Sequence, residues 1–165
     1  MTRFAIRPIT AIDFEGFHLC LDAVAGERKY LALVSAPPLE KTRQWLAEGL
    51  AQDAIRLVAA DQARVVGWCD IDSHAWEGFG HSGRLGMGVL SAYRGQGIGS
   101  ALLEQALAVA RNQQLERVEL EVYASNVAAI RLYEKFHFQT EGRKKKARKI
   151  DGEYDDLVLM ALLFN

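Results

Sequence analysis

The chain has 165 residues, half of them apolar and a quarter charged, which predicts one globular domain over residues 1–165. A formal net charge of −1 gives no indication of a nucleic-acid partner, and two distant cysteines exclude a disulfide framework and a cysteine zinc site. No apolar run approaches the ~20 residues of a membrane span and residues 1–5 show no signal-peptide core, so we expect a cytoplasmic protein without membrane or metal partners.

The first third of the chain alternates one strand with two helices. Residues 4–8 predict a short strand that ends at a proline, and Asp13 is placed to cap a helix. Apolar residues then recur at helical spacing, at Phe14, Phe17, Leu21 and Val24. The pair Pro37-Pro38 suits the first turn of a second helix, because proline lacks the N–H that a first turn leaves unused.

The middle of the chain is richer in strands. Residues 55–60 and 64–71 predict an antiparallel hairpin with a tight link, and another strand is expected at about residues 82–90. A long helix follows, and then a strictly alternating strand at residues 117–123. The apolar face of that helix consists of Leu102, Leu103, Ala106, Leu107 and Ala110.

The last part of the chain completes the element order. A helix begins at Asn126, and two final strands flank the turn dipeptide Asp151-Gly152. The order β, α, α, βββ, α, β, α, ββ predicts a mixed α/β (α+β) fold with a largely antiparallel sheet. It excludes a doubly wound fold and a barrel.

The most informative segment is Arg94-Gly95-Gln96-Gly97-Ile98-Gly99-Ser100, between a strand and the long helix. Glycines let backbone amides converge on an anion, and the helix N-terminus adds its positive dipole end. A flexible turn is the simpler interpretation of an isolated Gly-x-Gly. A Walker A loop is excluded because no lysine follows the glycines, and a dinucleotide fingerprint because Ser100 stands where its third glycine belongs.

This segment resembles the Arg/Gln-x-x-Gly-x-Gly/Ala signature of GCN5-related N-acetyltransferases (GNAT), met here by Arg94, Gly97 and Gly99. The resemblance implies a central, mainly antiparallel sheet of six to seven strands with about four helices, and acetyl-CoA as co-substrate. The CoA pyrophosphate would lie on the loop amides, and the pantetheine arm would pair with a strand that splays from its neighbour. The implied cofactor-binding residues are Met87, Gly88, Val89, Arg94, Gly95, Gln96, Gly97, Ile98, Gly99 and Ser100.

A second segment supports the resemblance. Asn126, Ala129 and Tyr133 match the closing motif of the family, in which an asparagine starts a helix and a tyrosine lies near the cofactor sulfur. By structure alone, Asn126 is a helix cap and Tyr133 a core aromatic. The resemblance adds both, with Ala129, to the cofactor site. His137 replaces the usual glycine after this helix, and we interpret it as a turn residue with positive φ.

The chemistry requires a proton donor and a proton acceptor. Tyr133 is the predicted acid for the departing thiolate, and the amide of Val89 a donor to the oxyanion. The ammonium form of an alkylamine has a pKa near ~10, so a base must remove its proton. Glu121 stands at the position where some relatives have the base, or it is simply a solvent-facing strand residue. A second group of titratable residues surrounds the start of the cofactor strand: Asp70, Asp72, His74, Glu77 and His81. His81 suits base work because histidine titrates near ~6.5, and a water-relayed base stays open.

The acceptor amine is less well determined. The resemblance implies an acceptor pocket lined by Glu27, Arg28, Lys29, Tyr30, Trp76, Glu77, Phe79 and His81. A mixed aromatic and charged lining favours a small polar amine as partner. Residues 151–160 resemble bacterial relatives that act on amino acids, and also those that act on protein N-termini. Because dimers are common in the family, a homodimer is allowed.

Three functions stay open at this point. The first is acetylation of a small amine, such as an amino acid, by direct attack in a ternary complex. The second is acetylation of a protein N-terminus or lysine. The third is a non-catalytic CoA-binding regulatory module, against which Tyr133 and Asn126 argue. The basic run at residues 143–149 is interpreted as the wet face of a terminal hairpin rather than as a contact for RNA or for the CoA 3′-phosphate.

Overall fold

The computed structural model describes residues 4–165. Residues 1–3, part of the segment without a signal-peptide core, lie outside the described residues. Seven strands form one sheet in the order β1-β2-β3-β4-β5-β7-β6, with one parallel pair, β4 and β5. They are β1 (Ala5–Pro8), β2 (Ile55–Asp61), β3 (Arg64–Ser73), β4 (Ser82–Val89), β5 (Arg117–Tyr123), β6 (Gln139–Ile150) and β7 (Glu153–Leu163).

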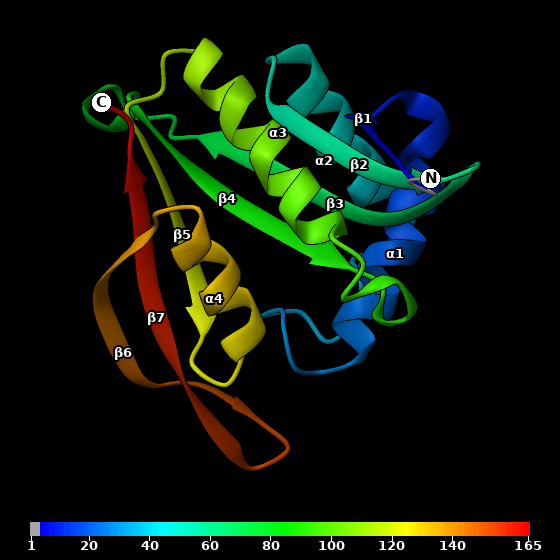
Figure 1. Ribbon diagram of the computed structural model, residues 1–165. Coiled ribbons are helices and arrows are strands. Elements are labelled where there is room, and N and C mark those ends of the chain that lie inside the picture. The colour runs from blue at the N-terminus through cyan, green and yellow to red at the C-terminus, as the bar shows by residue number, and fades with distance from the viewer. Residues whose placement is uncertain (1–3) are drawn as a thin grey trace.

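Four α-helices cover the two faces of this sheet. They are α1 (Phe14–Gly26), α2 (Leu39–Ala51), α3 (Ile98–Asn112) and α4 (Val127–Lys135). Figure 1 shows α3 and α4 on one face, with α1 and α2 behind the sheet on the other. The predicted mixed α/β fold, with six to seven strands and about four helices, is confirmed. Among the described residues, no helix is long and apolar enough to cross a membrane.

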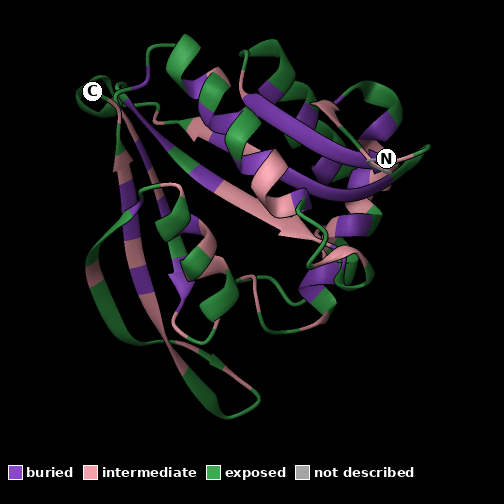
Figure 2. Cartoon of the chain, viewed as in Figure 1, coloured by how far each residue is buried: buried purple, intermediate pink, exposed green. Residues whose placement is uncertain are grey.

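The core lies where the sequence periodicity placed it. All five residues of the predicted apolar face of α3 are buried, and β2 is buried along nearly its whole length. Figure 2 shows this contrast, with β2 and β3 buried and β6 exposed over most of its residues. The outer hairpin therefore contributes less to the core than the central strands do.

The helix starts and the last turn lie near their predicted positions, but two capping details differ from the prediction. Pro38 is the N-cap of α2 rather than part of its first turn. Asp13 occupies the N-cap position of α1, as predicted, but its side chain does not bond to the helix, because its buried carboxylate accepts hydrogen bonds from Thr10 and from the Arg7 guanidinium instead. The Asp151-Gly152 turn is confirmed, and positive φ at both residues matches the twist of the hairpin.

The feature that positions the site is a split between β4 and β5. The two strands pair only from Ser82 to Arg84 on β4, while β4 continues to Val89 and β5 to Tyr123. Beyond this short parallel ladder they diverge, because β4 stays with β3 and β5 stays with β7. The predicted splay of the cofactor strand is therefore present in the fold.

Candidate active site

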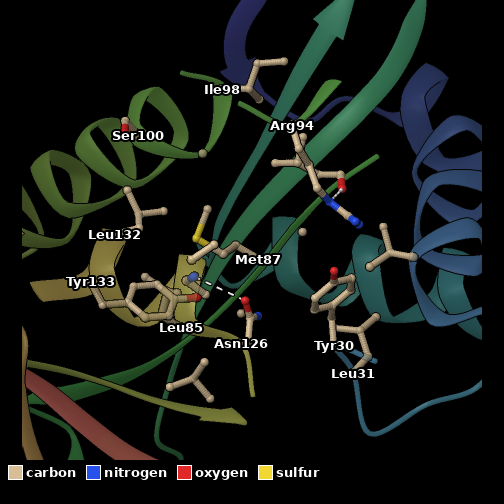
Figure 3. A pocket seen from close by; sticks show the side chains of 18 of the residues that line it. Tyr30, Leu31, Leu85, Met87, Arg94, Ile98, Ser100, Asn126, Leu132 and Tyr133 are labelled. Carbon is tan, nitrogen blue, oxygen red and sulfur yellow. Dashed lines mark hydrogen bonds between the residues drawn. The ribbon is translucent and has the colours of Figure 1, made fainter. Parts of the chain in front are cut away.

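A hollow of about 450 Å³ occupies the split between β4 and β5. Its walls come from the second half of β4, the glycine loop, the start of α3, and α4 (Figure 3). The loop after α1 closes the opposite side with Tyr30 and Leu31, which Figure 3 shows on the other side of the hollow from Tyr133. The lining includes Met87, Gly88, Val89, Arg94, Gly95, Gly97, Ile98, Gly99, Ser100, Asn126, Ala129 and Tyr133. Residues from two distant sequence segments thus share one cavity.

The glycine loop presents backbone rather than side chains to this hollow. Gly95 and Gly97 have φ of 73° and 84°, a conformation that L side chains rarely adopt, and no heavy atom lies within 4 Å of the Cβ position of either. Helix α3 begins at Ile98, and its first intrahelical bond runs from the Ala101 amide to the Gly97 carbonyl at 3.0 Å. The amides before Ala101 therefore remain available to an anion, with no acidic residue in the first turn to oppose it.

Arg94 and Gln96 have different tasks from the glycines. The Arg94 guanidinium donates to the Val89 carbonyl at 2.9 Å and to both Glu27 carboxylate oxygens at 2.8 and 2.5 Å. It also stacks 4.6 Å over the ring of Tyr30. Arg94 thus ties the end of β4 to the end of α1. Gln96 turns its amide to the Ala92 carbonyl at 3.1 Å and is not among the lining residues.

Backbone amides of β4 face the split. The Leu90 amide donates to the Val66 carbonyl on the β3 side, at 2.9 Å. Because successive amides of a strand point in opposite directions, those of Val89 and Met87 point away from β3, toward the hollow. They lie beyond the last β4–β5 pair, Arg84 with Glu119. This edge can pair with an extended ligand and donate to an oxyanion.

Helix α4 brings the second motif to the same cavity. The Asn126 side chain caps the helix by accepting from the Ala129 amide at 3.2 Å, as predicted for its structural role. Tyr133 lies two turns further along and is 7% exposed. Burial raises the pKa of its phenol above the ordinary value, and nearby Cys69 raises it further, so the hydroxyl stays protonated at neutral pH. His137 has the predicted positive φ, 69°.

A second, smaller hollow adjoins the first from the other face of the sheet. It has a volume of about 340 Å³ and lies between β3, β4, α1, α2 and the loop that joins the two helices. Leu31, Gly86 and Met87 line both hollows, so the two meet across β4. The remaining lining residues are Phe17, Leu21, Ala32, Leu33, Pro37, Lys41, Thr42, Trp45, Trp68 and Asp70.

Two glycines of β4 make this junction possible. A Cβ at Gly88 would come within 2.3 Å of the Trp68 ring, and one at Gly86 within 3.2 Å of an Asp70 carboxylate oxygen. The side chains of β3 therefore lie directly on the bare backbone of β4. The β3–β4 register runs without a bulge, so both glycines serve this close approach.

A comparison with protein-family models identifies the family to which this fold and site belong. The model of the Acetyltransferase (GNAT) family matches residues 25–138, well over half of the chain. The chain belongs to the GNAT family. It is therefore an acyltransferase, and the matched residues include the glycine loop, the split strand and the Asn126–Tyr133 segment.

Individual GNAT relatives agree with this assignment. The L-amino acid N-acetyltransferase AaaT of Escherichia coli (strain K12) is 35% identical over 107 residues, which are 64% of this chain and 66% of that protein. A ribosomal-protein-alanine N-acetyltransferase from Brucella melitensis is 27% identical with a TM-score of 0.90, covering 97% of this chain and 99% of that one. The structure of yncA from Salmonella typhimurium, with its cofactor acetyl-CoA, shares the fold at 18% identity and a TM-score of 0.92, over 99% and 95% of the chains.

The three candidate catalytic residues of this GNAT chain are not brought together. Tyr133 and Glu121 line the hollow in the split, but His81 lies in a separate surface hollow at the start of β4, with His74, Trp76 and Phe79. His81, one of the predicted candidates for the base, therefore lies outside the hollow that Tyr133 lines. A loop residue just before a strand stays at that strand's first end, whereas the split opens at its other end.

Glu121 is present in the hollow but already engaged. Its carboxylate accepts from Arg84 at 2.8 Å and from Lys144 at 3.1 Å, and its side chain is 31% exposed. Both carboxylate oxygens thus already have cationic partners. The solvent-facing alternative therefore describes its surroundings well.

The residues predicted to line the acceptor pocket do not lie in one place. Tyr30 faces the split, whereas Trp76, Phe79 and His81 do not. Arg28 pairs with Asp151 at 2.8 Å, and the Lys29 carbonyl accepts from Arg148 at 2.9 Å, so these residues dock the terminal hairpin. Trp45 and Trp68 line the smaller hollow, and no sequence signal marked them, because an aromatic within a helix or a strand is typical of the core.

The basic run is largely paired within the chain. Arg143 contacts Asp156 at 2.7 Å, Lys144 contacts Glu121, and Arg148 bonds to carbonyls after α1. Its interpretation as a hairpin face agrees with these contacts. Among residues 4–165, no three His, Cys, Asp or Glu side chains gather as metal ligands would.

Proposed function

We propose that residues 1–165 act as one acetyl-CoA-dependent N-acetyltransferase domain that acetylates the primary amine of a small molecule. The observation that carries this proposal is the meeting of two hollows at Gly86 and Met87. One is shaped for a long phosphate-bearing ligand, and the other is small and mostly apolar. A ternary complex with direct attack needs such an arrangement, because both substrates must reach one point together.

The larger hollow suits acetyl-CoA. The α3 amides and the loop at Gly95 and Gly97 would hold the pyrophosphate, and the amides of Met87 and Val89 would pair with the pantetheine arm. Asn126 and Ala129 shape the wall by fixing the start of α4. Tyr133 keeps its proton and is placed to donate it to the departing sulfur.

The smaller hollow suits an acceptor of limited size. About 340 Å³ holds a molecule of roughly amino-acid dimensions, and its walls are mostly aliphatic and aromatic. Lys41 is the one cation among its lining residues and is placed to meet a carboxylate. The name of the E. coli relative, an L-amino acid N-acetyltransferase, supports an amino acid as acceptor.

A protein N-terminus is the second candidate acceptor. The Brucella structure, a ribosomal-protein-alanine N-acetyltransferase, is similar over nearly the whole chain and favours it. A polypeptide acceptor would need to continue past the mouth of the small hollow. Testing short peptides beside free amino acids separates the two candidates.

The deciding experiment is thiol release from acetyl-CoA across free amino acids, polyamines, aminoglycosides and short peptides, with acetyl-CoA binding measured by calorimetry. We expect turnover with one class of small amine, and amino acids with apolar side chains are the first to try. Turnover with peptides alone would move the function to protein acetylation. Tight binding without any turnover would favour a CoA-binding regulator, and no binding at all would contradict the proposal.

A further inference from the structure

Asp70 lies on β3 where the two hollows meet. Its register partners are Arg56 on β2 and Gly86 on β4. Because Gly86 has no side chain, the carboxylate extends along β4, and a Cβ at Gly86 would lie 3.2 Å from its Oδ1. Asp70 thereby lines the small hollow beside Gly86 and Met87, the residues that also line the cofactor hollow. It is the only carboxylate among the residues lining the small hollow.

The neighbouring charges leave Asp70 without a close cationic partner among the ion pairs of residues 4–165. Arg56 faces it from β2, but its guanidinium donates to Asp72 at 2.5 Å and to the Ile55 carbonyl, and stacks 4.1 Å over Trp45. Asp72 lies two residues along β3. From α2, Lys41 lines the same hollow. On α1, His18 is bonded to Thr42 at 3.1 Å. On β4, Arg84 is the register partner of Asp72, and its guanidinium donates to Glu121 at 2.8 Å.

These surroundings change how Asp70 titrates. Burial among apolar side chains raises the pKa of its carboxyl to about 7; Arg56 opposes the rise, Asp72 adds to it, and the Trp68 side chain lowers the pKa through a hydrogen bond. A carboxyl that titrates near neutrality is unprotonated often enough to accept a proton. It is also basic enough to hold one, which an ordinary aspartate near ~4 is not.

We propose that Asp70 is the general base of this enzyme, removing a proton from the ammonium group of an acceptor bound in the small hollow. This inference rests on the proposed function. The ammonium loses one proton to an Asp70 oxygen and becomes a neutral amine. Its nitrogen then attacks the acetyl carbon; the C–N bond forms and the C–S bond breaks. The sulfur takes the Tyr133 proton, the nitrogen's surplus proton restores Tyr133, and Asp70 releases its proton to solvent.

The other candidates fit this task less well. Glu121 faces the cofactor side, and its two carboxylate oxygens already accept from Arg84 and Lys144. His81 is at the opposite end of β4. Asp70 alone of the three lies on the acceptor side of the junction, opposite the wall that carries Tyr133.

The test uses kcat as a function of pH with one amine that the wild type acetylates. We expect the wild-type kcat to rise with pH around a midpoint near 7, as Asp70 loses its proton. Asp70→Asn should lower kcat about 100-fold and remove this limb, while acetyl-CoA affinity by calorimetry stays unchanged. Unchanged affinity also shows that the variant is folded.

Asp72→Asn tests the pH profile itself: the midpoint of the rise in kcat should shift if Asp70 is the base, and should not shift if Asp70 has only a structural role. Removing the Asp72 charge takes away repulsion that raises the pKa of Asp70, and frees Arg56 to attract it, so the limb should move to lower pH. Glu48→Gln is the matched control: this exposed carboxylate on α2 accepts a hydrogen bond from Gln44, and its removal should leave the profile unchanged.

The outcomes separate the inference from the proposed function. If the wild type turns over and Asp70→Asn stays active with the same rise of kcat around pH 7, Asp70 is not the base. The proposed function would then remain intact. An unmoved limb in Asp72→Asn would count against Asp70 as the base in the same way. Absence of turnover in the wild type with every amine would overturn the proposed function, and this inference would fall with it.

Discussion

At the scale of one residue, the Tyr133 hydroxyl tests the chemistry most directly. We expect Tyr133→Phe to lower kcat about 100-fold, because a positioned acid for the leaving thiolate contributes roughly this much. Acetyl-CoA affinity should stay near that of the wild type, since the ring is retained. Steady-state kinetics with calorimetry measure both quantities.

The matched control is Tyr154→Phe, which removes the hydroxyl of an exposed tyrosine on β7. It should leave kcat unchanged. Undiminished turnover in Tyr133→Phe would remove this phenol from the mechanism and leave protonation of the thiolate to solvent.

At the scale of one element, the N-terminus of α3 depends on the left-handed conformation of its cap. Gly97→Val places a branched side chain at φ of 84°, which strains the backbone and turns the loop amides away from the anion. We expect acetyl-CoA binding to be lost in calorimetry.

Gly152→Val separates strain from site geometry. Gly152 has nearly the same φ, 83°, and equally open space around its Cβ position, but it lies in the β6–β7 turn. This control should lower the melting temperature while acetyl-CoA affinity stays unchanged. Equal loss of affinity in both variants would mean that strain alone, and not the phosphate loop, governs binding.

At the scale of the whole molecule, Asp13 joins the first strand to the helical layer. Its buried carboxylate accepts from Arg7 at 2.7 and 2.8 Å and from the Thr10 amide at 2.9 Å. The hydrogen bonds from Arg7 lower the pKa of Asp13 against the effect of burial. A lowered pKa stabilises the fold above pH ~4, and this contribution is lost as the pH falls through the pKa of the folded state.

Asp13→Asn should therefore lower the free energy of unfolding at pH 7 by about 2 kcal/mol, measured by urea denaturation. The difference from the wild type should shrink as the pH falls from ~4 through the lowered pKa of the folded state, below which the wild-type carboxyl is protonated too. Asp151→Asn is the control, because Asp151 and its Arg28 partner form an ion pair exposed to solvent, and such a pair should give little measurable change. A constant difference at all pH values would mean that packing, not charge, is lost in Asp13→Asn.

What the sequence determined by itself was local. Hydrophobic periodicity predicted the order of strands and helices, and all five residues predicted for the α3 core face are buried, with Ile98 buried in addition. The glycines at 95 and 97, the cap at Asn126 and the positive φ at His137 were also read from single segments. Backbone conformation and capping depend on neighbours in the chain, so a single sequence carries these signals.

The tertiary structure decided which residues meet. Strand register sets Asp70 against Gly86 and Trp68 against Gly88, and the end of the β4–β5 ladder determines where the split opens. The same geometry separates His81 from Tyr133, although the sequence analysis offered both as candidate catalytic residues. These placements depend on pairing between distant strands, and a one-residue shift of register would move every side chain to the other face. That is why the acceptor side of this site was visible only in the fold.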